Sequence, residues 1–97
     1  MAQAPQQKTV SICIPVYNEA ENLPVAVQAV EDLFATTLSR YRLEIIVTDN
    51  ASTDATWKTA QDLAAAKPHL KAYRFSRNFG YQNSVFAGLC MATGDAV

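Results

Sequence analysis

The chain has 97 residues, of which 49% are hydrophobic and 18% charged, and its formal net charge at pH 7 is -1. This composition fits one small globular domain and excludes a disordered chain, which would be poorer in Ile, Val and Leu. The near-neutral charge provides neither the basic surface of a nucleic-acid-binding protein nor a polybasic membrane patch. We therefore expect no nucleic-acid partner, and any anionic ligand must be held by local groups.

Residues 1–8 are polar and lack the basic and apolar regions of a secretory signal, so we expect a disordered tail followed by one domain over residues 9–97. Cys13 and Cys90 have neither a disulfide-framework pattern nor zinc-ligand spacing. We interpret both as small buried side chains in a reducing compartment. No run approaches the ~18 apolar residues that a membrane span requires.

Val10 to Val16 is almost entirely apolar, which is typical of a strand covered on both faces, and we expect it to be central in its sheet. Pro15 cannot donate to a sheet ladder, so regular pairing should end there. A helix is predicted from Ala20 to about Leu38, with Asn18 or, preferably, Asn22 as its cap. Its apolar face consists of Leu23, Val27, Val30, Leu33 and Phe34.

Leu43 to Thr48 is predicted to be a second strand, and Ser52 or Thr53 is predicted to cap a second helix that Pro68 ends. The apolar face of this helix consists of Trp57, Ala60, Leu63 and Ala64. Leu70 to Ser76 alternates between apolar and charged residues, which is typical of a strand near a sheet edge.

A third helix is predicted over residues 82–92, with Gly94 as the left-handed residue after it, and Asp95 to Val97 as the first residues of a fourth strand. Right-handed crossovers between these elements produce an α/β, Rossmann-like fold, a parallel sheet with helices on both faces. Open parallel sheets bind ligands at the carboxyl ends of their strands. We therefore look for a site after the first and second strands.

The loop after the first strand offers an aromatic face and a hydroxyl at Tyr17 and a carboxylate at Glu19, a combination that suits a nucleoside. Helix capping and packing explain the same residue types, so both interpretations stay open. In the second loop Asp49 and Asn50 precede the expected helix cap and are candidates to hydrogen-bond a base. The polar residues from Ser52 onward are interpreted as an ordinary helix start.

Three ordered motifs carry a family resemblance. Residues 15–19 match the pattern P-x-Y-N-E, residues 49–56 match D-D-G-S-x-D-x-T with two changes, and residues 76–80 read Ser-Arg-Asn-Phe-Gly. The chain resembles the N-terminal part of an inverting family 2 glycosyltransferase of the GT-A fold. The third motif, with Ala-Thr-Gly-Asp at residues 92–95, is similar to the branch that uses polyisoprenyl phosphate as acceptor, such as dolichyl- or undecaprenyl-phosphate mannosyl- and glucosyltransferases.

The resemblance implies a nucleotide-sugar site in this chain. Its residues are Pro15, Tyr17, Glu19, Thr48, Asp49, Asn50 and Arg77. The first three line the nucleotide pocket, the next three contact the base, and Arg77 is a candidate for the pyrophosphate or acceptor side. The second acidic residue of the family's D-D pair is Asn50 here, which leaves uracil and guanine both open.

The resemblance also implies a D-x-D motif a few residues after Asp95, whose carboxylates bind Mg²⁺ or Mn²⁺ and neutralise the leaving diphosphate. Those ligands, the general base and the acceptor groove are expected downstream of Val97. Asp95 itself lies at the wrong end of its strand and is not assigned to the metal. We therefore expect no catalytic residue and no metal ligand within this segment, which should not transfer sugar alone.

The resulting interpretation is an inverting hexosyltransferase of the cell envelope that moves a sugar from a nucleoside diphosphate-sugar to an acceptor, with a polyisoprenyl phosphate implied. It would act in the cytoplasm, or at the cytoplasmic face of the membrane through segments not present here. Two alternatives stay open: a family 2 transferase of polysaccharide or lipopolysaccharide synthesis, and a non-catalytic nucleotide-binding or scaffold module. Because the family's fourth strand lies beside its first, we also expect self-association through the open edge of Val10 to Val16.

Overall fold

The computed structural model describes residues 7–77 and 91–97 and consists of alternating strands and helices. The elements are β1 (Thr9–Val16), α1 (Asn22–Ala35), β2 (Arg42–Asp49), α2 (Thr56–Ala66) and β3 (Leu70–Arg74). Their order along the chain is the predicted one. Residues 1–6 of the expected tail lie outside the described residues, whereas the carbonyl of Lys8 accepts a 2.8 Å hydrogen bond from the Arg42 N–H.

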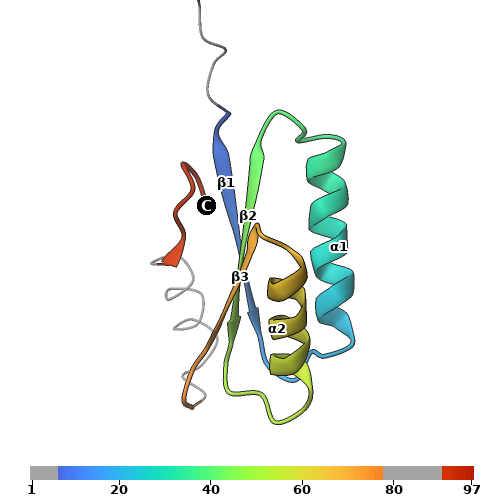
Figure 1. Ribbon diagram of the computed structural model, residues 1–97, viewed down its shortest axis with the longest axis vertical. Coiled ribbons are helices and arrows are strands. Elements are labelled where there is room, and N and C mark those ends of the chain that lie inside the picture. Colours follow the sequence, from blue (N-terminus) through green and yellow to red (C-terminus); the bar gives the residue numbers. More distant parts are fainter. Residues whose placement is uncertain (1–6, 78–90) are drawn as a thin grey trace, which may run out of the picture.

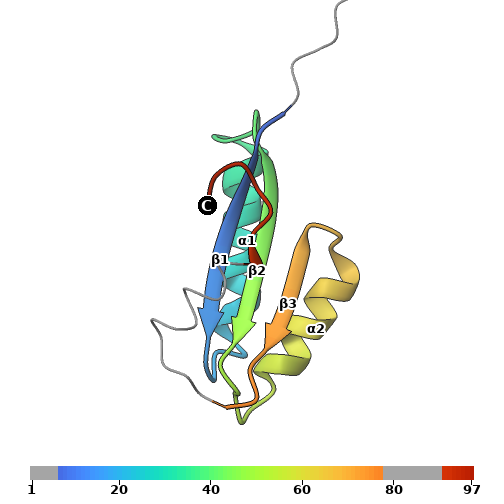
Figure 2. The ribbon, with the colours of Figure 1, turned by 90° about the vertical axis from the view of Figure 1, so that its left-hand side faces the viewer.

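The three strands form a parallel sheet in the order β1-β2-β3. Both described helices lie on one face of this sheet (Figure 1), the arrangement that two right-handed crossovers produce. Residues 91–97 lie on the opposite face, in front of β1 and β2 in Figure 2. The expectation of a covering helix on that second face concerns residues 82–92, of which 82–90 lie outside the described residues, together with Cys90.

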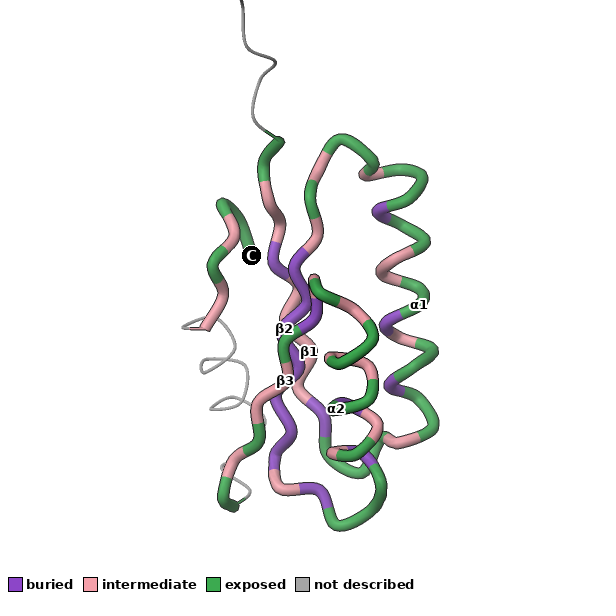
Figure 3. Tube along the Cα trace, viewed as in Figure 1, coloured by how far each residue is buried: buried purple, intermediate pink, exposed green. Residues whose placement is uncertain are grey.

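The buried strand of this sheet is β2, and the prediction that residues 10–16 form the central strand is wrong for the described sheet. Ile45, Ile46 and Val47 are fully buried, whereas most of β1 is only half-buried (Figure 3). The outer side of β1 has a strand neighbour in the described residues only at its start, where Val10 forms a parallel bridge with Ala96. That bridge confirms that the predicted fourth strand begins beside the first.

The core lies between the sheet and the two helices. Leu23 and Val27 of α1 and Ala60 of α2 pack against Ile45 and Val47 of β2. These residues belong to the apolar faces that the sequence periodicity predicted. Leu33, predicted for the same face of α1, is instead 45% exposed. Among the described helices, neither is long and apolar enough to cross a membrane.

The predicted caps of both helices are wrong. The first helical residue of α1 is Asn22 itself, preceded by Glu21, and no side chain caps it. Helix α2 begins at Thr56, later than expected, and the carboxylate of Asp54 accepts the Thr56 N–H at 2.9 Å. Short polar side chains near a helix start have several possible backbone partners, and the local sequence does not rank them.

Gly94 does not have the predicted left-handed conformation, since its φ lies outside that region. Glycine is required there for space. A Cβ at this position would overlap Ser11 Oγ and lie 3.0 Å from the carbonyl oxygen of Thr9. Cys13 is half-buried rather than buried, and partial burial raises the pKa of its thiol.

Candidate functional site

The loops that follow β1 and β2 meet at the carboxyl end of the sheet, at the bottom of Figure 1. Tyr17, with 45% of its surface exposed, and Glu19 point an aromatic ring and a carboxylate to solvent from the first loop. Thr48, Asp49 and Asn50 at the end of β2 are buried. The sheet therefore brings the two predicted groups of site residues together, one exposed and one buried. We call this region the crevice.

Hydrogen bonds from Asn18 join the two loops of the crevice. Asn18 has a left-handed backbone with φ 52°, its N–H donates to Ser52 Oγ at 2.9 Å, and its Oδ1 accepts the Thr53 N–H at 2.9 Å. The Glu19 N–H adds a bond to Thr56 Oγ1 at 2.8 Å. Because these bonds span different loops, Tyr17 and Glu19 are held at a defined position relative to β2. Ser52 and Thr53, interpreted from sequence as helix caps, serve this connection instead.

Asp49 is fully buried, and its carboxylate organises the second loop. One carboxylate oxygen accepts the Ser52 hydroxyl, and the other lies 3.3 Å from the Ser52 amide nitrogen and 3.4 Å from Arg74 Nε. Ser52 Oγ thus donates to a carboxylate and accepts the Asn18 N–H, which one hydroxyl can do simultaneously. We call this arrangement a hydroxyl bridge. That Asp49 also contacts a base stays a prediction.

Arg74 is a crevice residue that the sequence analysis missed. Its guanidinium lies beside Asp49, donates to the Ser52 carbonyl oxygen at 3.0 Å and lies 5.9 Å from the centre of the Trp57 ring. The Arg74 side chain is 44% exposed, so it is accessible to solvent as well as bonded within the crevice. Its place in an alternating strand near a sheet edge gave no reason to assign it to the site. The register of β3 with β2 pairs it with Asp49 and supplies that reason.

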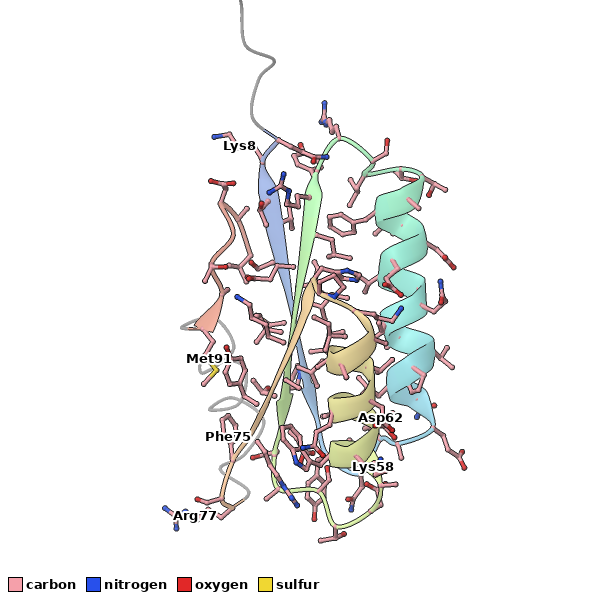
Figure 4. All side chains as sticks on the ribbon, in the orientation of Figure 1. Lys8, Lys58, Asp62, Phe75, Arg77 and Met91 are labelled. Carbon is pink, nitrogen blue, oxygen red and sulfur yellow. The ribbon has the colours of Figure 1, made fainter. Side chains whose placement is uncertain are left out.

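The remaining predicted residues lie around the same end of the sheet. Pro15 and Glu19 line a hollow of about 150 Å³ between the end of β1 and the first turns of α1. This volume is smaller than the ~300 Å³ or more of a typical small-molecule pocket, so it fits only part of a nucleotide. Arg77 is exposed beyond the end of β3 (Figure 4). The N–H of the buried Asn50 donates to the Val16 carbonyl at 2.9 Å.

Ala51 closes the second loop with a left-handed backbone, φ 61°. Its position corresponds to the glycine of the D-D-G-S pattern. L-residues with a Cβ are disfavoured in this conformation by about 1–2 kcal/mol. The bonds that hold the loop therefore maintain a strained residue in the crevice.

Metal ligands are not grouped in the described part of the chain: no three Asp, Glu, His or Cys side chains there lie close enough to hold an ion. Asp95 lies at the far end of the sheet from the crevice, and its carboxylate accepts the Thr9 N–H at 2.8 Å. Asp54, at the start of α2, has its pKa lowered by hydrogen bonds from the Thr56 side chain and backbone. These carboxylates therefore have structural partners.

Comparison with known proteins adds three likenesses. The family model described as "Glycosyl transferase family 2" matches residues 11–97. A prophage bactoprenol glucosyl transferase homolog of Escherichia coli K12 is 38% identical over 88 residues, which is 91% of this chain and 28% of that protein. An undecaprenyl-phosphate 4-deoxy-4-formamido-L-arabinose transferase of Klebsiella pneumoniae strain 342 is 34% identical over 98 residues, covering 100% of this chain and 29% of that protein.

A solved structure shows the same fold. The mannosyltransferase of Pyrobaculum calidifontis, in complex with GDP-Man and Mn²⁺, superposes with a TM-score of 0.68 and 26% identity. The match covers 93% of this chain and 26% of that one. The chain thus spans less than a third of the length of each relative it matches here.

Proposed function

Because the chain belongs to glycosyl transferase family 2 and has its GT-A fold, we propose that the whole protein is an inverting glycosyltransferase whose crevice binds a nucleoside diphosphate-sugar. Residues 9–97 form the N-terminal nucleotide-binding part of that domain. The observation that carries the proposal is the junction of the two matched motifs at one end of the sheet, with Asn18 bonded to Ser52 and Thr53. A ligand at this end contacts both loops at once.

Each crevice residue has a proposed task. Tyr17 stacks on the nucleobase and Glu19 accepts hydrogen bonds from ribose hydroxyls, since both are exposed and held by the Asn18 connection. Asn50 reads the base edge. Arg74 and Arg77 offer cationic groups at the same end of the sheet, which suits a diphosphate because guanidinium groups bind its oxygens through paired N–H donors.

A polyisoprenyl phosphate is the proposed acceptor, supported by the names of the two relatives, one of which contains bactoprenol and the other undecaprenyl phosphate. An oxygen of the acceptor phosphate would form the new bond to the anomeric carbon as the bond to the donor diphosphate breaks on the opposite side, which inverts the configuration. The described residues provide binding and orientation for the donor. They do not form a metal site. We propose, from the family resemblance, that the Mg²⁺ or Mn²⁺ of the whole protein takes its ligands from downstream of Val97. When bound, the ion would stabilise charge on the departing diphosphate.

Calorimetric titration tests the proposed donor site. UDP-glucose and GDP-mannose, each with Mn²⁺, are titrated into this chain and into a form extended by about 140 residues, roughly a complete domain of this class. We expect the extended form to bind one of the two and Tyr17→Ala to lose that binding. Tyr41→Ala is the matched control, since Tyr41 lies next to the start of β2, at the opposite end of the sheet. If neither form binds either nucleotide, the non-catalytic scaffold interpretation replaces the enzyme.

Two further properties are proposed for the molecule as a whole. The full protein would act in the cytoplasm or at the cytoplasmic face of the membrane, where fractionation of the intact protein should find it. The 97-residue chain would self-associate through the outer edge of β1, because in the described residues only its first part, at Thr9 and Ser11, is hydrogen-bonded to the segment around Ala96. A monomer mass by light scattering at every concentration would contradict this second proposal.

A further inference from the structure

A second buried carboxylate, Glu44, lies far from the crevice and has no part in donor binding. It is the third residue of β2, on the face opposite the helices, and is 7% exposed. An isolated buried charge is costly, and Glu44 is paired with donors from three other segments. Ser11 of β1 donates its hydroxyl at 2.6 Å, Lys71 of β3 donates at 3.1 Å, and Thr93 donates both its N–H, at 2.8 Å, and its hydroxyl.

These donors keep Glu44 ionised. Burial disfavours the charged form, but the hydrogen bonds from Ser11, Thr93 and Lys71 outweigh it and lower the pKa of this carboxyl from 4.5 to about 2. Ser11 Oγ also accepts the Gly94 N–H at 2.9 Å, which makes a second hydroxyl bridge, from Glu44 through Ser11 to Gly94. The absence of a Cβ at Gly94 allows this close approach. Segment 93–94 is therefore fastened directly to the sheet.

The residues that follow segment 93–94 pair with the start of β1. The Asp95 N–H donates to the Thr9 carbonyl at 2.7 Å, and the Ser11 N–H donates to the Ala96 carbonyl at 2.7 Å. The bridge between Val10 and Ala96 is parallel, so the chain leaves this point in the direction of β1. Since the crevice lies at the carboxyl end of β1, six residues beyond Val10, a chain continuing in this register arrives beside the crevice about six residues beyond Ala96.

We propose that Glu44 is a positioning residue: through Ser11 and Thr93 it holds residues 93–96 in parallel register with β1 and so directs the chain that follows toward the crevice. It touches no ligand itself. The anchoring of residues 93–96 stands on the hydrogen bonds above. Its consequence for catalysis rests on the proposed function, because it requires that the continuing chain supply groups that act on the departing diphosphate of a donor already bound by the two loops.

Hydrogen exchange measures the anchor directly. The experiment uses the full-length protein. Glu44→Gln keeps the shape of the side chain but removes its charge, which weakens every hydrogen bond that Ser11, Lys71 and Thr93 donate to it. We expect the amides of residues 93–96 to exchange about tenfold faster or more, with those of Asn18 and Thr53 in the crevice unchanged. Glu31→Gln is the matched control, because Glu31 is also ion-paired, with Lys67 and His69, but lies on α1 at the other face.

Thr93→Val supplies a second variant in case Glu44→Gln does not fold. It removes only one hydroxyl donor to Glu44, on an exposed residue, and keeps the backbone N–H. We expect a smaller change in the same amides. Unchanged exchange at residues 93–96 in both variants, or an equal increase over the whole chain, would overturn the anchor.

Steady-state kinetics test the consequence for the crevice. For Glu44→Gln we expect kcat to fall about tenfold while KM for the nucleotide-sugar is unchanged, because the donor loops keep their own bonds. Unchanged kcat would overturn the positioning role even if exchange increases. If the unmodified protein transfers no sugar, the proposed function fails, and the exchange experiment still decides whether Glu44 anchors residues 93–96.

Discussion

The crevice and the surroundings of Glu44 on the opposite sheet face contain the same arrangement of hydrogen bonds, which serves a different purpose in each. In the crevice the hydroxyl bridge runs from Asp49 through Ser52 to the Asn18 N–H, and on the opposite face it runs from Glu44 through Ser11 to the Gly94 N–H. Each buried carboxylate fixes the orientation of a hydroxyl, and the hydroxyl then holds a distant backbone. A charged acceptor strengthens such bonds to roughly twice those between neutral groups.

The difference lies in what each bridge presents. The crevice bridge leaves Tyr17 and Glu19 exposed to a ligand, whereas the bridge at Glu44 presents no exposed ligand-binding group and secures a strand start. The cationic partners differ accordingly, since Arg74 lies at the crevice and Lys71 lies near the start of β3. One bridge therefore shapes a binding surface, and the other sets the path of the chain.

The largest effect is expected from removing the crevice carboxylate. Asp49→Ala leaves the Ser52 hydroxyl and N–H without their acceptor in a buried loop, and we expect the free energy of unfolding to fall by about 3–4 kcal/mol. Urea unfolding of the chain measures this. Asp62→Ala removes an exposed carboxylate as the control. Equal stability of the two variants would show that the crevice bridge contributes nothing.

Acid should weaken the bridge at Glu44. The pKa of this carboxyl is about 2 in the folded chain and near 4.5 when unfolded, so its contribution is complete above pH 4.5 and is lost as pH falls from 4.5 toward 2. The loss is up to about 3 kcal/mol. Urea unfolding at a series of pH values should show this slope reduced in Glu44→Gln. If stability depends on pH equally in Glu44→Gln and in the unmodified chain, the hydrogen bonds assigned to Glu44 do not lower its pKa.

Relief of backbone strain should stabilise the crevice loop. Ala51→Gly places the residue type that tolerates φ 61° at this position, and we expect a net gain of about 1 kcal/mol after the greater freedom of glycine in the unfolded chain is included. Thermal unfolding measures the gain. Ala65→Gly within α2 is the matched control and should lose about 1 kcal/mol. A loss in both variants would argue against strain at Ala51.

The smallest effect is expected at a surface ion pair of α2. Lys58 and Asp62 lie 3.3 Å apart and are 77% and 67% exposed (Figure 4), so solvent screens their attraction. Lys58→Ala should change the unfolding free energy by less than about 0.5 kcal/mol, measured by urea unfolding at low salt. A loss as large as that of Asp49→Ala would show that the exposed ion pair of Asp62 contributes as much to stability as the buried bonds of Asp49.

The sequence by itself determined the order of the elements, the parallel sheet and the end of the sheet at which the crevice lies. Periodicities of two and 3.6 residues are local properties of the chain, and they act before any tertiary contact forms. The prediction that regular pairing ends at Pro15 is wrong, since β1 stays paired with β2 through Val16. The three motifs determined the family for the same reason, because their spacing is written along the chain.

Only the tertiary structure decided which strand is buried and what Ser52 and Thr53 bind. It also decided that Arg74 lies in the crevice and that Glu44 bonds to three other segments. An apolar run such as residues 10–16 is compatible with a central or an outer position, and the pairing order chooses between them. A hydroxyl accepts from whichever N–H the fold brings within reach, here that of Asn18 from 34 residues away. A charge such as Glu44 acquires its role from partners on other strands, which no local pattern specifies.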